Sequence, residues 1–369
     1  MTEKELFRTN NFDLIRLLAA LEVAIHHSLH HLEVRDHWLF HSTSWLPGVP
    51  IFFFVSGFLI SKSYESNSRI SEYARNRALR IFPALILCTT LSLISVFATG
   101  YFESQSWSLL HMIAWILGQV TIFQFYSPDF IRGFGSGALN GSLWTVTVEL
   151  QFYLLIPLIY WMLARTASRG QRTVMLAVLI LAFIVPNEVF QQLILDGHNS
   201  QKLAIKFARI SFLPWIYMFL LGILAQQNFK WIHKLVRGRG LQIACAYAAI
   251  TYITVHFFNW SKGNEIHPAL FPLLAVTVLS VAYTAPTLCD RLLHKNDISY
   301  GVYIYHMPII NIMLYYGLLS KYSYVAMALA LTIAIATCSW FIIERPAIRR
   351  KKRPLVDLAR VNSAQEART

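Results

Sequence analysis

Apolar stretches long enough to cross a lipid bilayer recur along almost the whole chain. A membrane-spanning helix needs about 20 mostly apolar residues, and eleven stretches approach that length: roughly residues 12–31, 49–63, 81–99, 108–126, 143–163, 173–189, 210–227, 241–258, 268–284, 298–317 and 324–343. They leave little sequence for a water-soluble part, in agreement with the mean hydropathy of +0.47. The sequence therefore predicts an all-α, polytopic integral membrane helix bundle that forms a single domain over residues 1–369.

Basic residues are concentrated in short segments between the apolar stretches. The richest segments are 62–80, 165–172, 230–239 and the tail at 347–369. Lys and Arg accumulate in cytoplasmic loops, so the formal charge of +13 indicates membrane topology rather than nucleic-acid binding. If all eleven apolar stretches crossed the membrane, some of these basic segments would lie outside the cytoplasm. All of them can be cytoplasmic only if one apolar stretch does not cross the membrane. We expect 108–126 to be that re-entrant or interfacial segment, which leaves about ten transmembrane helices and both termini cytoplasmic.

The first apolar stretch carries ionisable residues that lipid would penalise. In RLLAALEVAIHHS, residues 16–28, Arg16 and His27 are eleven residues apart, about three helical turns, and so lie on one face. A charged group at the membrane centre costs roughly 2.5–3.5 kcal/mol on insertion scales. The polar face, which includes Glu22, should point into the bundle. Neighbouring helices could satisfy it structurally, but an Arg and a His on one face beside further buried polar groups favour a functional site.

Other stretches also place polar side chains inside the membrane. Glu149 and His306 lie within two later apolar stretches. RNRALRIFP begins the third stretch with Arg77 and Arg80 at i,i+3 spacing, near the expected start of a helix, where guanidinium groups and the helix dipole together suit a phosphate. Simple anchoring by positive charge is the alternative. The histidine pairs in HHSLHH have a spacing that metals use, but no H-E-x-x-H motif accompanies them, so we expect no metal site.

Six motifs follow one another over residues 12–346: FDLIRLLAALEVAIHH, GVPIFFFVSGFLIS, RNRALRIFP, LWTVTVELQFYLL, ISYGVYIYHMPI and IIERP. Each motif alone is a weak signal. Taken in this order, they make the chain resemble the acyltransferase-3 family of bacterial membrane proteins, which O-acylate surface polysaccharides and related acceptors.

The resemblance implies roles for four of these residues. Arg16 and His27 would be catalytic, and Arg77 and Arg80 would bind the donor; Asp13, three residues before Arg16, is expected to position it. Coenzyme A is cytoplasmic and carries phosphates, so the expected co-substrate is acetyl-CoA or another acyl-CoA, with no permanently bound cofactor. The acceptor would be a glycan or lipid-linked sugar. The protein would lie among the lipids of the bacterial inner membrane, without a nucleic-acid partner.

The expected reaction centres on one imidazole. His27 would take the proton of an acceptor hydroxyl as its oxygen attacks the acyl carbon, or would carry the acyl group covalently. Glu149 is expected to be catalytic as well, by orienting this imidazole or binding the sugar. The thioester and the alcohol should therefore meet at His27 inside the bundle. Further pocket candidates are Ser56, Tyr153 and His306.

The alternative hypothesis is a proton-coupled or metal-ion membrane transporter that uses the same buried His, Glu and Arg residues. Many transporters are built from two related halves. We detect no internal repeat in this sequence, and this favours the acyltransferase.

Overall fold

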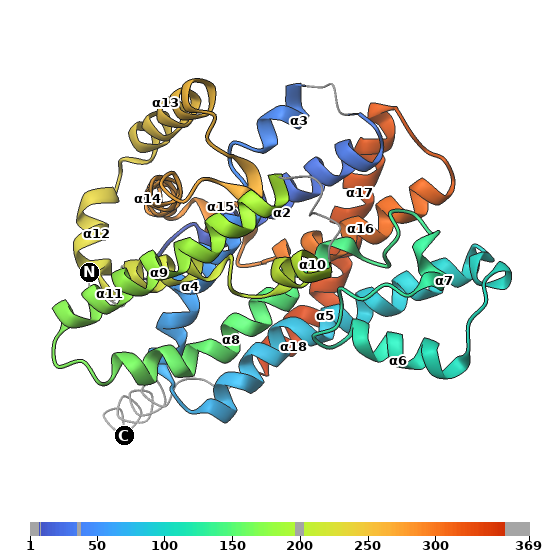
Figure 1. The fold of residues 1–369 in the computed structure, drawn as a ribbon, viewed down its shortest axis with the longest axis horizontal. Coiled ribbons are helices and arrows are strands. Elements are labelled where there is room, and N and C mark those ends of the chain that lie inside the picture. Colours follow the sequence, from blue (N-terminus) through green and yellow to red (C-terminus); the bar gives the residue numbers. More distant parts are fainter. Residues whose placement is uncertain (1–6, 8, 35–37, 196–202, 351–369) are drawn as a thin grey trace, which may run out of the picture.

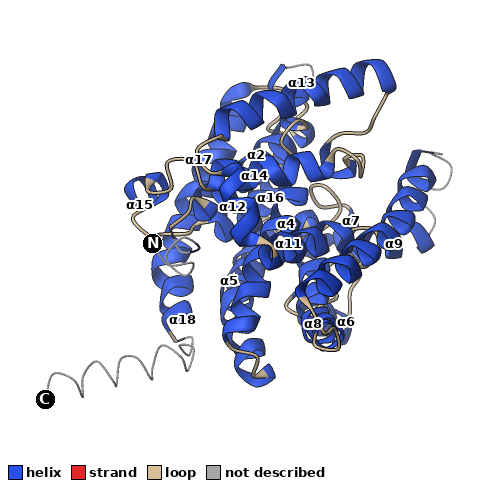
Figure 2. Cartoon of the chain, turned by 90° about the vertical axis from the view of Figure 1, so that its left-hand side faces the viewer, coloured by secondary structure: helices blue, strands red, loops and turns tan. Residues whose placement is uncertain are grey.

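The computed structural model describes residues 7, 9–34, 38–195 and 203–350 of the chain. These residues form helices joined by short connections, and no strand occurs among them. The helices pack against one another in both views (Figures 1 and 2). The prediction of an all-α fold is confirmed. Most of the predicted basic tail, residues 351–369, lies outside the described part of the chain.

The longer helices are α2 (Phe12–His31), α4 (Gly48–Ser66), α5 (Ile70–Ala98), α6 (Leu109–Gln119), α8 (Trp144–Leu163), α9 (Arg169–Leu195), α11 (Ile216–Gln227), α13 (Gly240–Phe258), α14 (Phe271–Ala282), α16 (Ser299–Tyr315) and α17 (Tyr322–Ser339). Shorter helices connect them: α3 (Trp38–Thr43), α7 (Asp129–Arg132), α10 (Leu203–Ile210), α12 (Phe229–Val236), α15 (Leu288–Leu293) and α18 (Arg345–Arg349). The 3₁₀ segments are η1 (Tyr101–Ser104), η2 (Gly141–Leu143) and η3 (Gly263–Glu265), and η4 (Trp340–Glu344) is a π-helical turn.

Six helical segments of the described chain are long and apolar enough to cross a membrane: Trp38–Ser66, Ile70–Ala98, Gly141–Leu163, Arg169–Ile194, Gly240–Phe258 and Tyr322–Arg349. They correspond to six of the roughly ten predicted spans. Among the other four, α11 and α14 have 12 residues each and α16 has 17. The helix α2 has 20 residues, but its polar side chains make it less apolar. Length and composition therefore support a membrane protein, and they identify six of the roughly ten predicted spans.

The segment expected not to cross, residues 108–126, contains the short helix α6. Its 11 residues span roughly 16 Å, about half of a ~30 Å hydrocarbon core. After Gln119 the chain turns, and it reaches α8 through α7 and η2. The helices α11 and α14, which lie in segments predicted to cross, are almost as short, so the expectation that 108–126 does not cross the bilayer stays a prediction.

The polar connection between α7 and α8 docks onto α16. The Asn311 side chain donates to the main-chain oxygens of Ala138 and Leu139, at 2.8 and 3.1 Å, and accepts from the N–H of Ser136 at 2.9 Å. Irregular backbone at membrane depth is tolerated where protein satisfies its polar groups. The contacts with Asn311 meet this requirement and bring the start of α8 beside α16.

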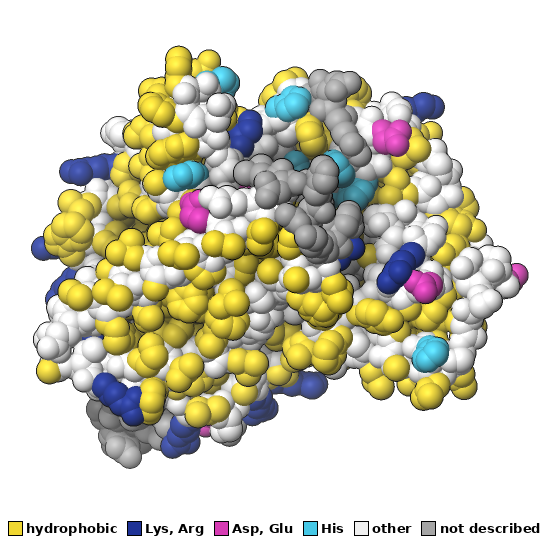
Figure 3. All heavy atoms as spheres, in the orientation of Figure 1, with side chains coloured by type: hydrophobic (Ala, Val, Ile, Leu, Met, Phe, Trp, Pro, Cys, Tyr) yellow, Lys and Arg dark blue, Asp and Glu magenta, His cyan; other side chains and the backbone are white. Residues whose placement is uncertain are grey.

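A broad apolar surface covers the face that α8 and α9 present in Figure 3. Its members include the exposed side chains of Leu154 and Leu158 on α8 and of Val174, Val178 and Leu181 on α9. Lys and Arg lie along the lower edge of this view and also at its left and upper-right margins, and most of the visible His lie in its upper part. An apolar band between polar edges is the arrangement that a surrounding bilayer requires.

The closest contact in the centre of the bundle joins α4 and α11. A Cβ added to Gly57 would lie 2.0 Å from the main-chain oxygen of Phe219, and one added to Gly222 would lie 2.3 Å from that of Phe54. Two backbones can approach this closely only where side chains are absent, a common arrangement in membrane helix pairs. These two glycines therefore set the distance between α4 and α11.

Replacing Gly57 by Ala should destabilise the bundle. Alanine favours an isolated helix by up to about 1 kcal/mol over glycine, but the new methyl group would collide with main-chain atoms, and overpacking typically costs about 1–3 kcal/mol. We expect a lower melting temperature for the detergent-solubilised Gly57→Ala protein. Gly170→Ala is the control, because its Cβ would meet only Ser168 Oγ at 3.8 Å. Equal melting temperatures for the two variants would contradict this account of the crossing.

Candidate active site

A cavity of about 380 Å³ lies between α2, α4, α5, α8 and the start of α16. Four basic and three acidic side chains are among its lining residues. Seven of the nine predicted site residues line it: Asp13, Arg16, Ser56, Arg77, Arg80, Glu149 and Tyr153. The other two, His27 and His306, lie outside it. The structure thus gathers residues from four helices at one place, as the sequence predicted, but separates them from the histidines.

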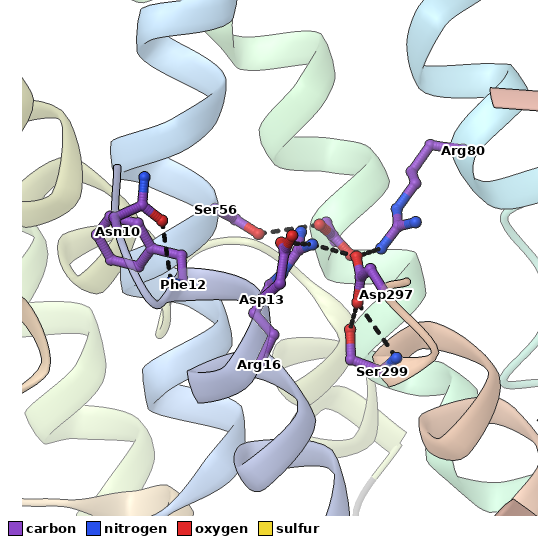
Figure 4. Close-up of polar contacts among 9 residues, drawn as sticks. Asn10, Phe12, Asp13, Arg16, Ser56, Arg80, Asp297 and Ser299 are labelled. Carbon is purple, nitrogen blue, oxygen red and sulfur yellow. Dashed lines mark hydrogen bonds and ion pairs between the residues drawn. The ribbon is translucent and has the colours of Figure 1, made fainter. Parts of the chain in front are cut away.

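Asp297, which the sequence analysis did not identify, is the centre of the charged cluster. It forms ion pairs with Arg16 of α2 and, at 2.5 Å, with Arg80 of α5. The main-chain N–H and the hydroxyl of Ser299 donate to its other oxygen, at 3.2 and 2.5 Å. Asp13 also pairs with Arg16, at 2.8 Å, as predicted. Figure 4 shows the two arginines reaching Asp297 from different helices.

The environment of Asp297 keeps this residue ionised. Burial raises the pKa of its carboxyl group, but the adjacent Arg16 and Arg80 and the hydrogen bonds from Ser299 lower it more, so that the pKa lies below the usual range of an aspartate. Asp297 directly precedes the predicted span 298–317, and its side chain accepts a hydrogen bond from the N–H two residues later. This capping pattern, D-x-S before an apolar stretch, is the sequence signal that could have identified it.

The start of α2 is fixed by Asn11. Its side-chain amide donates to the main-chain oxygens of Thr284 and Ala285, at 2.9 and 3.1 Å, and its Oδ1 accepts from the N–H of Cys289 at 3.0 Å. Asn11 is buried, so these bonds attach the first turn of α2 to the connection between α14 and α15. They place Arg16, little more than one turn later, at the cavity.

Glu22, on the predicted polar face of α2, caps the next helix. Its Oε2 accepts from the N–H of Gly48, the first residue of α4, at 2.7 Å. The first N–H groups of a helix have no partner within the helix, and a carboxylate suits their positive end. A Cβ on Gly48 would lie 2.3 Å from the main-chain oxygen of Ala19, so the two helices touch here. This contact positions α4, and with it Ser56, relative to α2.

Arg77 differs from Arg80 in having no carboxylate partner among the described residues. Its guanidinium group lies over the rings of Tyr73 and Tyr153, 6.0 and 5.7 Å from their centroids, and its Nε makes no hydrogen bond. Lys295, at the edge of the cavity, likewise has no ion pair within the part of the chain that is described. Arg77 and Lys295 are therefore the cations of this cavity whose charge is not already neutralised.

The position of the arginine pair corrects one part of the sequence-based argument. The helix α5 begins at Ile70, so Arg77 and Arg80 lie two to three turns inside it and not near its N-terminus. The charge of a helix dipole falls off within the first turn. A contribution of the α5 dipole to phosphate binding was therefore a wrong prediction, and only the guanidinium groups themselves remain available for it.

Glu149 contacts different partners from the one expected. Its Oε1 accepts hydrogen bonds from the hydroxyls of Ser56, at 3.0 Å, and Tyr153, at 2.5 Å. The bond from Ser56, drawn in Figure 4, joins α4 to α8, and the bond from Tyr153 lies within α8. The expectation that Glu149 orients the imidazole of His27 is wrong, because the hydrogen-bond partner of that ring is another histidine.

His27 and His306 form a pair of imidazoles between α2 and α16. Nδ1 of His27 lies 2.8 Å from Nε2 of His306, and the ring centroids are 5.1 Å apart. His306 is almost completely buried. The neighbouring His26 points elsewhere, with its Nδ1 2.8 Å from Thr43 Oγ1 and its ring against Phe40. The helix therefore turns His27, rather than His26, toward the interior, as the predicted face required.

Tyr303 lies between the cavity and this histidine pair. It lines the cavity, and its ring packs edge-to-face against Phe52 on one side and His306 on the other, with centroids 5.5 and 5.9 Å apart. Its hydroxyl lies 2.5 Å from Thr145 Oγ1. The expectation that one continuous cavity joins His27 to the arginines is not met, because the Tyr303 ring stands between them. The spacing of apolar residues in the sequence gives no reason to distinguish Tyr303 from other core residues.

No group of three or more potential His, Cys, Asp or Glu metal ligands is found within the described residues. The i,i+4 histidine pairs of HHSLHH engage in ring packing instead: His27 lies 6.0 Å from His31 and His26 lies 6.4 Å from His30, between centroids.

Comparisons with known proteins agree with this architecture. The acyltransferase-3 family, described as an acyltransferase domain, matches residues 9–344. "Nodulation protein 10" of Rhizobium leguminosarum bv. viciae is 31% identical over 354 residues, 92% of this chain and 93% of that protein. An "O-acetyl transferase" of Shigella phage Sf6 is 24% identical over 93% of this chain and 97% of its own length.

A third similar protein is longer. "O-acetyltransferase OatA" of Staphylococcus aureus is 24% identical over 92% of this chain, which corresponds to 57% of OatA. No solved structure matches the chain. The family match covers nearly all helices of the bundle and every lining residue of the cavity except Ile348, and the chain therefore belongs to the acyltransferase-3 family of membrane acyltransferases.

Removing the charge of Asp297 should destabilise the protein. In Asp297→Asn, Arg80 would lose the carboxylate with which it pairs and Arg16 would keep only Asp13, and breaking a buried ion pair costs up to about 3–5 kcal/mol. We expect a lower melting temperature in detergent. Asp129→Asn is the matched control, because the Asp129–Arg132 pair is exposed and such pairs contribute about 0–1 kcal/mol. An unchanged melting temperature for Asp297→Asn would show that the cluster is not structural.

Proposed function

We propose that this protein is a membrane O-acyltransferase that moves an acyl group, most simply acetyl, from cytoplasmic acyl-CoA to a hydroxyl of a periplasmic or surface glycan. The family supports the acyl transfer, and two similar proteins are named O-acetyltransferases. The observation that carries the proposal is a cavity with unneutralised cations, with the Tyr303 ring between it and the imidazoles of His27 and His306. In this proposal the protein lies in the bacterial inner membrane with both termini cytoplasmic.

The cavity suits the donor. Arg77 and Lys295 can form charge-assisted hydrogen bonds with phosphate groups without first breaking an ion pair. Apolar side chains of α4 and α5, among them Val55, Leu59 and Ile81, provide a wall for the less polar pantetheine arm. Arg80 acts differently in this proposal: with Asp297 it holds the cavity in shape and contributes its remaining N–H groups.

His27 is the proposed general base. A neutral imidazole can accept the proton of the acceptor hydroxyl while the hydroxyl oxygen attacks the thioester carbon. Because Tyr303 separates the cavity from the histidines, the acyl end of the donor must pass the Tyr303 ring to reach this oxygen. An acyl-histidine intermediate on His27 is the variant of this mechanism in which the imidazole itself attacks.

The transporter hypothesis receives no support from the comparisons, since the family and two of the named relatives are described as acyl-transferring proteins. Several charged side chains inside the bundle also have partners there: Asp297 pairs with Arg16 and Arg80, Glu22 caps α4, and Glu149 accepts a hydrogen bond from Ser56. They do not need a transported ion to explain them.

The proposal is tested with purified protein in liposomes that contain lipid-linked glycan from bacterial membranes. Radiolabelled acetyl-CoA should label the glycan, and mass spectrometry should find it heavier by one acetyl group. His27→Ala should reduce the rate by roughly 10²–10⁴-fold, the usual contribution of general base catalysis, while its melting temperature stays close to that of the unchanged protein. Full activity of His27→Ala would remove His27 from the mechanism, and an unlabelled glycan would contradict this donor and acceptor.

Arg77→Ala should weaken donor binding selectively. A hydrogen bond to a charged group is worth about 1.5–3 kcal/mol, so the KM for acetyl-CoA should rise roughly 10–100-fold, less at high salt, with the KM for the glycan unchanged. Arg165→Ala is the control, because Arg165 is exposed and stacks on Trp161. A parallel rise in both KM values would argue against a donor-binding role.

A further inference from the structure

The histidine pair lacks the carboxylate that usually orients a catalytic imidazole. None of the described ion pairs or hydrogen bonds joins His27 to an aspartate or glutamate. The groups around its ring are imidazoles: His306 at 5.1 Å, His31 at 6.0 Å and His26 at 6.1 Å between centroids. An ionised carboxylate would be costly at this depth in a membrane, whereas a second neutral imidazole can orient the first without adding charge.

We infer that His306 is a positioning residue for His27: its Nε2 accepts a hydrogen bond from Nδ1–H of His27, which leaves the lone pair on Nε2 of His27 free to act as the base. This inference rests on the proposed function. The sequence suggested Glu149 as the residue that orients His27 and named His306 only as a pocket candidate. The inference assigns this orienting role to His306.

The surroundings of His306 decide which histidine donates. Two neutral imidazoles 2.8 Å apart share one proton, so one nitrogen is the donor and the other the acceptor. The second nitrogen of His306, Nδ1, is buried and makes no hydrogen bond, and the main chain of Val302 and Tyr303, one turn earlier in α16, lies beside the ring. Carbonyl oxygens only accept hydrogen bonds, so they favour a proton on Nδ1 of His306.

That proton determines the rest of the pair. With hydrogen on Nδ1, the Nε2 of neutral His306 is an acceptor, and Nδ1 of His27 must then be the donor. In the opposite arrangement, Nδ1 of His306 would carry a lone pair that points at carbonyl oxygens. Two hydrogen-bond acceptors buried against each other are unfavourable in a low-dielectric interior. The tautomer of His27 with a free Nε2 is therefore the more stable one.

The proton transfers balance in the proposed reaction. The acceptor hydroxyl gives its proton to Nε2 of His27 as its oxygen forms a bond to the thioester carbon. The resulting imidazolium keeps its Nδ1–H on His306. When the carbon–sulfur bond breaks, the leaving sulfur takes the proton from Nε2, so that the ester and free coenzyme A are released and His27 returns to its starting tautomer. His306 does not touch the substrates at any step.

Two substitutions of His306 separate positioning from packing. Leu fills similar space but cannot accept a hydrogen bond, whereas the side-chain oxygen of Gln can. We expect His306→Leu to lower kcat by roughly 10–100-fold, the usual effect of losing the partner that orients a functional histidine, and His306→Gln to restore most of it. The KM for acetyl-CoA should not change in either variant, because His306 lies outside the cavity. His256→Leu is the control, since His256 is exposed and its Nδ1 lies 2.9 Å from Tyr252 O, within its own helix.

The tautomer is measured directly by NMR of protein with ¹⁵N-labelled histidine, the His27 signals being assigned with His27→Ala. We expect an unprotonated Nε2 and a protonated Nδ1 in His27, and a mixture of both tautomers in His306→Leu. A protonated Nε2 in the unchanged protein would overturn the inference. This measurement also decides the matter if His306→Leu does not fold, because it needs no variant of His306.

The outcomes distinguish an error in the role of His27 as the base from an error in the role of His306 as its positioning residue. If His27→Ala retains full acetylation, the proposed base is wrong and the role of His306 falls with it. If His27 is essential but His306→Leu and His306→Gln keep the kcat of the unchanged protein, only the positioning role is wrong. Equal losses in the Leu and Gln variants would indicate packing rather than hydrogen bonding, and would also overturn the inference.

Discussion

One carboxylate shared by two guanidinium groups determines how the helices around the cavity can pack. Unpaired charges are costly in a low-dielectric interior, so Arg16 of α2 and Arg80 of α5 must both reach Asp297, directly before α16. This requirement fixes three chain segments that are far apart in the sequence. It also divides the basic residues of the cavity into two kinds: Arg16 and Arg80 pair with Asp297, whereas Arg77 and Lys295 form no ion pair among the described residues.

Prolines inside helices provide a second set of connections. A proline lacks an N–H and so leaves the carbonyl four residues earlier without its helical partner. In α16, Pro308 frees the carbonyl of Ile304, which accepts from the Asn140 side chain at 2.7 Å. In α8, Pro157 frees that of Tyr153, which accepts from Tyr73 OH at 3.2 Å. The prolines thus free carbonyl groups that attach the site helices to their neighbours.

The site was partly predictable from the sequence. Arg16 was found because charged residues in apolar stretches are rare and must point inward. Arg77 and Arg80 were assigned to the donor through the resemblance to the family, and all three arginines line one cavity. His27 was separated from His26 by helical period alone. The partner of His27 was not predictable, since Glu149 and His306 are both inward-facing polar residues, and only the packing of α2 against α16 rather than α8 distinguishes them. Asp297 was missed because it lies in a loop, where an aspartate is ordinary.

Periodicity, apolar length and the order of motifs were sufficient to establish a helical membrane acyltransferase, because these properties depend on residues close together in the chain. They also identified which side chains could not face lipid. Long-range contacts were required for the rest: which carboxylate neutralises which arginine, which imidazole meets His27, and where Tyr303 closes the cavity. Those pairings depend on how the helices pack against one another, which is set by contacts such as that of Gly57 with Phe219. A local sequence pattern carries no information about how two distant helices meet.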